Sequence, residues 1–222
     1  MNIFYLDSDA QVCAEMHNDK HVVKMILEYA QLLSTAHRVL DGVEIIEKKY
    51  VLGSLPARWR KCKVWKLNDD RDSILYKATH MNHPSAKWAR HSAMNYYWLY
   101  TLLDALCKEY TFRYAKIHKC ERSGLLNRLQ TTPISIPIAP FTAPWRAMPD
   151  EFKVDRAITD YTVKSYRAYY LGAKVKMSRW TDRAMPIWFA DGINSLYEDA
   201  CYVEHKPKLN KIISMPLQYA NL

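Results

Sequence analysis

Glycine is scarce in this chain, with 5 among 222 residues. So few glycines argue against glycine-rich phosphate loops and against many tight β-turns. Serine-hydrolase elbows, Walker loops and dinucleotide-binding glycine motifs are also missing, which excludes several large enzyme classes. No apolar run approaches the roughly 18 residues of a membrane-spanning helix, and the opening residues lack the basic segment of a signal peptide. We therefore expect no membrane association.

The chain has five cysteines and no Cys-x-x-Cys pair. An odd number without such a pair indicates reduced thiols in a cytoplasm rather than a disulfide framework. The histidine and cysteine pairs that could begin a metal site each lack further ligands nearby: His80-x-x-His83, Cys13-x3-His17 and His118-x-Cys120. We therefore expect neither a metal nor a cofactor.

What the sequence has in excess is positive charge and aromatic side chains. The net charge is +9 with a pI near 9.2, and there are 7 Trp and 16 Tyr. Basic proteins are drawn to polyanions, nucleic acid first, and aromatic rings among cations suit base stacking. Solubilisation and a large aromatic core are the alternatives that composition leaves open.

Hydrophobic spacing predicts a mainly α protein. We expect a single helical domain over 1–191, with residues 192–222 as an extension packed on it. Residues 2–6 read as a short strand or an extended arm, and 43–52 as strand or loop. Helices are expected at 8–17, from Asn18 or Asp19 to about Leu40, at 86–114, at 123–130, and at 155–175 as the last main helix. Residues 131–149 hold five prolines, which predicts an ordered extended segment with buried Ile, Phe and Trp side chains.

The helix after Asn18 carries the first candidate site. Its apolar positions, Val22, Val23, Ile26, Leu27, Ala30 and Leu33, predict one buried face. A polar stripe on the other side contains His21, Lys24, Glu28, Gln31 and Thr35. A carboxylate beside a lysine and a histidine can perform acid–base chemistry, and we take Glu28, His21 and Lys24 as candidate catalytic residues. The alternative is an exposed helix face with a Lys24–Glu28 ion pair.

A basic stretch carries the second candidate site. Within "RWRKCKVWK" the candidate DNA-binding residues are Arg58, Trp59, Arg60, Lys61 and Lys63. Cations neutralise phosphates, and tryptophan can stack on an unpaired base. A solvated basic loop is the alternative.

Two further groups could contact a substrate. His83, Arg90 and Asn95 lie at the start of the helix expected at 86–114, where Lys87, His91 and Asn95 would form one polar row and Met94 part of the core stripe. Arg179 and Arg183 lie in a tryptophan-rich stretch that could close over a ligand. These arginines could equally be surface charges.

The stretch "NDKHVVKMILEYAQLL" resembles the first helix of the pyrimidine-dimer DNA glycosylase/AP lyases of T-even phages, the endonuclease V family. That family's motif is Asp-x-His at the helix start with a catalytic Glu seven residues after the His. Asp19, His21 and Glu28 match it here. Weaker similarity continues through "HPSAKWARHSAMNYYWLYTLLDALCKEYTFRY", "MPDEFK" and "RWTDRAMPIWF". The whole chain looks closer still to uncharacterised tailed-phage proteins, which would place it in the cytoplasm of an infected bacterium.

The resemblance implies a compact helical fold of the pyrimidine-dimer glycosylase type, and binding to double-stranded DNA with a flipped nucleotide. It implies that Glu28 handles protons while an amine attacks C1′ of the damaged nucleotide, and that His21 orients the substrate or the carboxylate. Residue 2 is Asn, before which the initiating Met is normally retained. The amine would therefore be that of Met1 or a lysine such as Lys20 or Lys24, unless a water attacks, in which case AP lyase activity is absent.

Two other functions fit the same residues. One is a transferase that modifies a nucleobase or nucleotide in phage DNA metabolism. The other is a non-catalytic basic protein that binds nucleic acid through the stretch around Trp59.

Overall fold

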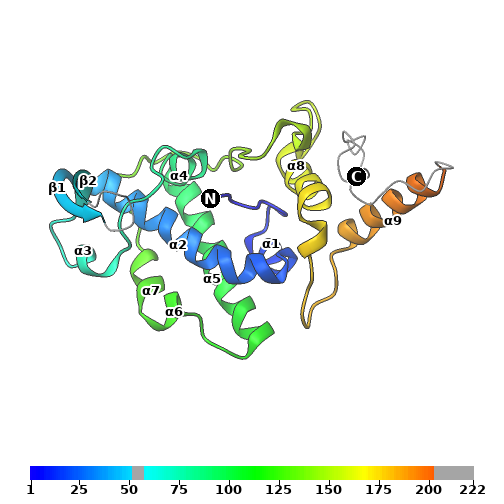
Figure 1. Cartoon of the computed structure of the whole chain (residues 1–222), viewed down its shortest axis with the longest axis horizontal. Helices are drawn as coiled ribbons and strands as arrows, with labels where there is room; N and C mark the ends of the chain where they lie inside the picture. The colour runs from blue at the N-terminus through cyan, green and yellow to red at the C-terminus, as the bar shows by residue number, and fades with distance from the viewer. Residues whose placement is uncertain (52–57, 203–222) are drawn as a thin grey trace.

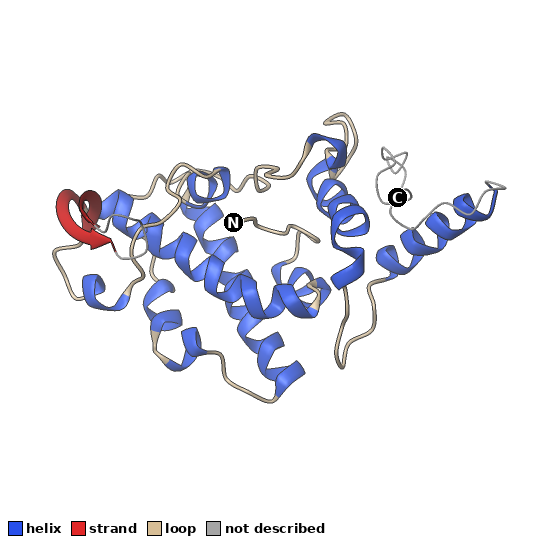
Figure 2. Ribbon diagram, in the orientation of Figure 1, coloured by secondary structure: helices blue, strands red, loops and turns tan. Residues whose placement is uncertain are grey.

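The computed structural model describes residues 1–51 and 58–202, and it is mostly helical (Figures 1 and 2). The expected mainly α class is confirmed, with one antiparallel strand pair within the described residues. The helices and strands are α1 (Ala10–Met16), α2 (Asp19–Asp41), β1 (Val43–Val51), β2 (Arg58–Lys66), α3 (Arg71–Ile74), α4 (Pro84–Ala89), α5 (Ala93–Tyr114), α6 (Lys119–Arg122), α7 (Leu125–Leu129), α8 (Tyr161–Tyr169) and α9 (Ile187–Tyr202). In the described part of the chain, no helix is long and apolar enough to cross a bilayer.

The first residues form an extended arm that is part of the core. The side chains of residues 3–6 are at most 5% exposed, and the Phe4 backbone N–H donates to the Tyr29 hydroxyl at 3.1 Å. The arm ends at Asp9, whose carboxylate accepts from two backbone N–H groups of α1 and caps that helix. Because four consecutive side chains are buried, core packing fixes the position of the N-terminus, which Figure 1 shows in the middle of the molecule near α2 and α4.

α2 is the central helix, and it begins where the sequence predicts. The Asn18 side chain accepts from the His21 backbone N–H at 2.9 Å, which satisfies one of the free donors at the helix start. Part of the expected buried face is wrong, since Val23 and Leu27 are 44% and 41% exposed. α2 packs most extensively on α5, and these two side chains stay accessible to solvent.

The single helix expected at 86–114 is two helices. α4 stops at Ala89, and Ser92 caps a new helix by accepting from the Asn95 N–H at 3.1 Å. The expected polar row of Lys87, His91 and Asn95 is therefore wrong, because the break turns α4 away from the axis of α5. Met94, expected in the core, is 51% exposed for the same reason.

The strands form a hairpin at the C-terminal end of α2, at one end of the molecule in Figure 1. Residues 43–51, left open as strand or loop, are β1. Arg38 of α2 is fully buried and ties the hairpin and the loop after it to the helix. Its guanidinium donates to the carbonyls of Trp65, Asp72, Leu75 and Tyr76 and to the Asp72 carboxylate. These hydrogen bonds satisfy a charge that would otherwise be costly to bury.

The proline-rich segment 131–149 contains no helix, as its composition predicts. It runs along α4 and α5: the Ala93 N–H donates to the Pro137 carbonyl at 2.8 Å, and the Trp88 indole N–H to the Thr142 carbonyl at 2.9 Å. The expectation that its large apolar side chains are buried is wrong in part, since Ile134 and Ile138 are 85% and 98% exposed. The segment is held by backbone hydrogen bonds, so these side chains need not pack.

The C-terminal part contains one more helix than expected. The turn η1 (Asp150–Phe152) precedes α8, which continues through a π turn, η2 (Tyr170–Lys174), and a 3-10 turn, η3 (Val175–Met177). Gly172 allows close packing there, because a Cβ would collide with the Phe152 ring. α9 then spans the position where the sequence placed a boundary between domain and extension, and residues 203–222 of that extension lie outside the described part of the chain.

Candidate active site

The amine of Met1, at the start of the arm, faces the carboxylate of Glu28 on α2. The Met1 nitrogen lies 3.9 Å from Glu28 Oε2, and Lys24 Nζ lies 3.2 Å from Glu28 Oε1. The Glu28 side chain is 15% exposed, whereas that of Lys24 is 68% exposed. The carboxylate therefore lies between the terminal amine of Met1, whose side chain is 5% exposed, and an exposed lysine. This arrangement brings a potential nucleophile together with a group that can carry its protons.

Three contacts hold the terminus at this place. The buried arm fixes its direction, the Tyr29 hydroxyl accepts from the Phe4 N–H, and the Ser85 hydroxyl donates to the Met1 carbonyl at 3.5 Å. Tyr29 directly follows Glu28 in α2. The residue that anchors the arm thus adjoins the residue that faces the amine, which sets the distance between amine and carboxylate.

His83 is connected to the same site through Ser85, which contacts both Met1 and His83. As the N-cap of α4, its Nδ1 accepts from the Ser85 N–H at 3.2 Å, so the neutral ring carries its proton on Nε2. Burial lowers the pKa of His83, the positive amine of Met1 and His80 lower it further, and Glu28 opposes them. His83 is thus electrostatically coupled to both groups of the site. Pro84 signals the cap in the sequence, but no pattern shows that this loop lies beside the N-terminus.

His21 is not on the open face of α2, so the expected stripe with Lys24 and Glu28 is wrong. Its ring is 4% exposed, stacks on Phe4 with centroids 4.0 Å apart, and bonds the Tyr170 hydroxyl through Nδ1 at 2.5 Å. Phe4 of the arm and Tyr170 of η2 cover His21, whereas Glu28 lies beside the end of the arm, at the Met1 amine. His21 therefore supports the arm that carries the amine and does not itself face the site.

The buried histidines make stability depend on pH. Burial lowers the pKa of His17 to about 4; burial, with the charges of His17, Lys174 and Lys24, lowers that of His21 to about 2. The unfolded chain takes up these protons near pH 6.5, so the stabilisation is complete above that pH and is lost as pH falls toward the folded values. Between pH 7 and 4 we expect each histidine to remove about 3 kcal/mol from the free energy of unfolding. Urea unfolding at several pH values measures this, and an equal midpoint at pH 7 and 4.5 would contradict it.

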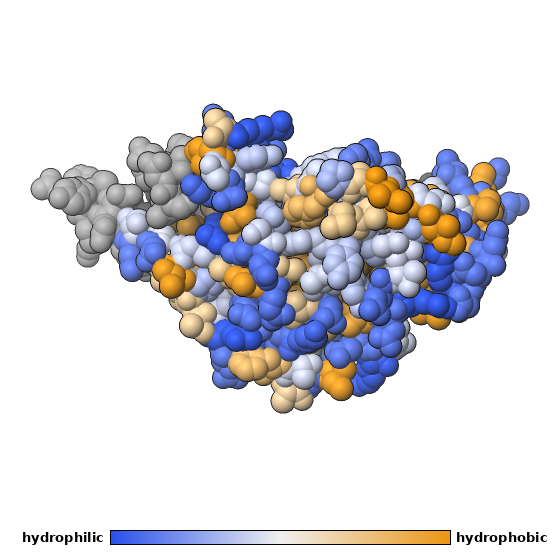
Figure 3. All heavy atoms as spheres, turned by 180° about the vertical axis from the view of Figure 1, so that it is seen from behind, coloured by the Kyte–Doolittle hydropathy of each residue, from blue (hydrophilic) through white to orange (hydrophobic). Residues whose placement is uncertain are grey.

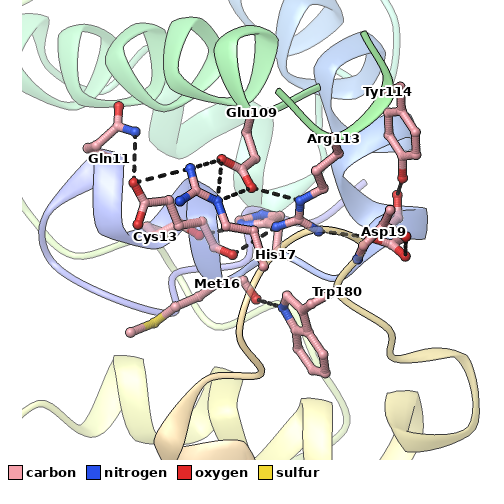
Figure 4. A network of polar contacts seen from close by, with 12 residues as sticks. Gln11, Cys13, Met16, His17, Asp19, Glu109, Arg113, Tyr114 and Trp180 are labelled. Atoms are coloured by element: carbon pink, nitrogen blue, oxygen red, sulfur yellow. Dashed lines mark hydrogen bonds and ion pairs between the residues drawn. The ribbon is translucent and has the colours of Figure 1, made fainter. Parts of the chain in front are cut away.

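Asp19, Glu109 and Arg113 belong to an ion-pair network (Figure 4), which Arg183 joins through Glu109. Glu109 accepts from Arg113 Nε at 2.7 Å and from Arg183 Nη2 at 2.8 Å, and Arg113 Nη1 donates to Asp19 at 2.9 Å. Asp19 also accepts from the Thr181 N–H and hydroxyl. Nε and Nη2 of Arg183 both donate to Glu109, so this edge of the guanidinium is bound within the protein, while the side chain is 30% exposed and its contact with DNA stays a prediction. The Asp19 carboxylate likewise holds the loop after α8 to the start of α2.

Asn95 also has a structural role in place of the expected DNA contact. It is fully buried, donates to the Trp88 carbonyl at 3.2 Å, and accepts from the Thr142 N–H at 2.9 Å. Arg90, at the end of α4, is partly buried, and burial lowers its pKa. Its Nη1 and the Asn2 side-chain oxygen are buried without a hydrogen-bond partner among the described residues. The contact of Arg90 with a substrate stays a prediction.

The basic stretch forms β2, a strand instead of a loop. Trp59, Arg60, Lys61 and Lys63 are exposed on it, whereas the Arg58 side chain lies outside the described residues. The Arg179 side chain is exposed, and its carbonyl accepts from the Asp19 N–H at 2.8 Å. The structure thus collects Met1, Lys24, Glu28 and His83 at one place and the basic strand at another.

Family models, curated proteins and solved structures offer no match to this chain. Within the described residues, no three His, Cys, Asp or Glu side chains are grouped as a metal site would require. The function is therefore argued from the geometry around Glu28.

Proposed function

We propose that this protein is a DNA-acting enzyme that works, like a glycosylase, on a damaged or modified base. The observation that carries the proposal is the 3.9 Å separation between the Met1 amine and the Glu28 carboxylate, at the surface and yet fixed by the core. The net charge of +9 supports a polyanionic substrate. The match of Asp19, His21 and Glu28 to the pyrimidine-dimer glycosylase motif adds support, and Glu28 is the matching residue at the site.

In the proposed reaction the free Met1 amine attacks C1′ of a nucleotide flipped out of the duplex. The bond from C1′ to the base breaks, its electron pair leaves with the base, and the base takes up a proton. Glu28 accepts protons from the amine and stabilises positive charge on the sugar. The sugar ring opens to give an imine between Met1 and C1′, and water hydrolyses this imine to restore the amine.

The amine of Met1 is better suited to this step than that of Lys24. The core holds the terminus in place, whereas the Lys24 side chain is 68% exposed and loses more freedom on reacting. Lys24 would then balance the charge of Glu28, and the His83 Nε2–H would donate to a substrate phosphate or leaving base.

Base release from defined duplexes tests the proposal. Short duplexes with a single pyrimidine dimer, oxidised base, alkylated base or phage-type modified base are incubated with the protein, and released base is measured by mass spectrometry. On the true substrate we expect Glu28→Gln to lower the rate at least about 100-fold, because the acid–base group is lost. Glu151→Gln, the same change at an exposed glutamate of η1, retains the wild-type rate.

Two outcomes would reject the proposal. If the wild type leaves every duplex intact and Glu28→Gln behaves identically, Glu28 is not catalytic toward DNA bases. A gain in mass on the DNA or on free nucleotides, with the base retained, would instead identify a transferase.

A further inference from the structure

The β1–β2 hairpin has one face that is open to solvent along its whole length. In the antiparallel register Tyr50 pairs with Trp59, Lys48 with Lys61, and Ile46 with Lys63. Directly opposed residues share a face of a sheet, so these six side chains define the outer face of the hairpin. Trp59, Ile46 and Lys63 are each about two-thirds exposed, and Tyr50 is 51% exposed. The opposite face carries half-buried residues, among them Ile45, Cys62 and Val64.

Repulsion between two lysines on the outer face lowers the stability of the hairpin. Lys48 lies directly opposite Lys61, and like charges at opposed positions destabilise a strand pair. Neither lysine has an ion-pair partner in the described part of the chain. Lys63 is the one lysine of the face that is neutralised, by Glu44 at 2.7 Å. Two uncompensated lysines side by side suit an anionic ligand that bridges them.

Next to these lysines, toward the end of the hairpin, stands an exposed aromatic pair. The rings of Tyr50 and Trp59 lie 5.5 Å apart at an interplanar angle of 61°. This edge contact leaves a ring face of Trp59 free, in agreement with its 67% exposure. Free aromatic faces beside cations are the elements that bind unstacked bases and their phosphates.

Arg38 fixes the base of the hairpin to α2, because its guanidinium donates to the Trp65 carbonyl of β2 at 2.9 Å. Figure 3 shows the molecule from behind, with largely hydrophilic residues and a few isolated apolar ones at the end that carries the hairpin. Among the described residues, the face of this end that Figure 3 shows has no broad apolar area of the kind that marks a protein-binding surface.

We infer that the outer face of the hairpin binds unpaired nucleotides of a nucleic-acid strand, with phosphates on Lys48 and Lys61 and a base stacked on Trp59. An acidic peptide would match the lysines and leave the aromatic pair unused. From the pair Tyr50–Trp59 to the pair Ile46–Lys63 the face measures roughly 13 Å along the strands, at about 3.3 Å per residue. That length suits a short run of nucleotides.

The hairpin and the candidate active site lie at different points of α2. Thirteen residues separate Glu28 from Asp41, where α2 ends and the hairpin follows, which is roughly 20 Å of helix at about 1.5 Å per residue. A strand held on the hairpin would extend the contact of the protein with DNA well beyond the nucleotide at Glu28. The inference rests on the hairpin's own residues and does not require that Glu28 be catalytic.

Fluorescence anisotropy with a labelled oligothymidylate tests it on the full chain. We expect Trp59→Ala to weaken binding about 5- to 150-fold, the effect of losing one stacked base, and Trp59→Phe to restore most of it. The double variant Lys48→Gln/Lys61→Gln should lower the slope of log affinity against log salt by about 1.4. Tyr97→Ala, at an exposed tyrosine of α5, and Lys116→Gln/Lys119→Gln, at exposed lysines beside α6, should bind as wild type does.

Three results would overturn the inference. One is unchanged oligothymidylate affinity of Trp59→Ala. Another is equally tight binding of inorganic polyphosphate or polyglutamate, with Trp59→Ala weakening each to the same extent. The third is binding to phosphatidylserine vesicles, but not to oligothymidylate, that is lost in the same variants. Base release from the duplexes is measured separately from oligothymidylate binding by the hairpin variants, so failure of the proposed function would not be mistaken for failure of this site.

Discussion

Replacing Glu109 with alanine is expected to lower the free energy of unfolding by about 3–5 kcal/mol, a large part of the roughly 5–15 kcal/mol that stabilises an ordinary domain. Glu109 is 1% exposed and accepts hydrogen bonds from Arg113 and Arg183. Burial alone would raise the pKa of Glu109, but hydrogen bonds from these two arginines outweigh it and hold the pKa below its ordinary value. Its removal leaves the charge of Arg113 buried with only Asp19 and the Glu15 carbonyl as partners.

Asp104→Ala provides a matched control on the same helix. Asp104 also pairs with a cation four residues away, Lys108 at 2.6 Å, but both side chains are accessible, at 31% and 69%. Exposed pairs of this kind contribute at most about 1 kcal/mol. Urea unfolding followed by circular dichroism compares the variants. A midpoint for Glu109→Ala as high as that of Asp104→Ala would show that the network is not what holds α5 to the loop after α8.

Blocking the Met1 amine is expected to abolish turnover while the fold is kept. Acetylation removes the nucleophilic pair of electrons, and one inserted residue displaces the amine by about 3.5 Å. A displacement of even 1 Å can cost about 100-fold in rate, so both changes should lower base release by at least that factor. The mass of the N-terminal peptide is measured first, to establish that the amine of Met1 is free in the wild type.

Lysine substitutions distinguish Met1 from Lys24 and Lys20 as the attacking amine. Lys24→Arg removes the side-chain amine beside Glu28, and Lys20→Arg removes one about two turns earlier on α2. Both changes keep the charge, and both variants should keep base release. A loss of base release in Lys24→Arg, together with full activity of the acetylated protein, would transfer the role of nucleophile to Lys24.

The sequence predicts α2 well because the capping residues at its two ends and the hydrophobic spacing between them indicate the same helix. Asn18 is a good N-cap, and Gly42 follows the last turn, where a Cβ would collide with the Arg38 carbonyl. Periodicity also gives the angle at which each side chain leaves the helix. His21 and Glu28 are two turns apart and leave at nearly the same angle. His21 is buried because Phe4 and Tyr170 pack on it, whereas Glu28 lies beside the Met1 amine and is 15% exposed, and no local pattern encodes what covers a helix.

The remaining differences have similar causes. Ser92 is one residue inside an otherwise continuous helical pattern, and its cap outweighs the pattern. Ile134 and Ile138 look like core residues by composition, yet backbone hydrogen bonds hold their segment. Arg183 reads as a free basic side chain because Glu109, its partner, lies 74 residues away in the sequence. Contacts between distant segments decide these cases, and they are invisible to local spacing.

Borohydride trapping tests the central claim most directly. The reagent reduces an imine between protein and sugar to a stable amine, so a reacting duplex becomes covalently attached, and peptide mass spectrometry then locates the attachment. We expect the wild type to give an adduct on the α-nitrogen of Met1, absent from the acetylated protein and reduced at least about 100-fold in Glu28→Gln. An adduct on a lysine, or released base with no adduct at all, would contradict the role of Met1.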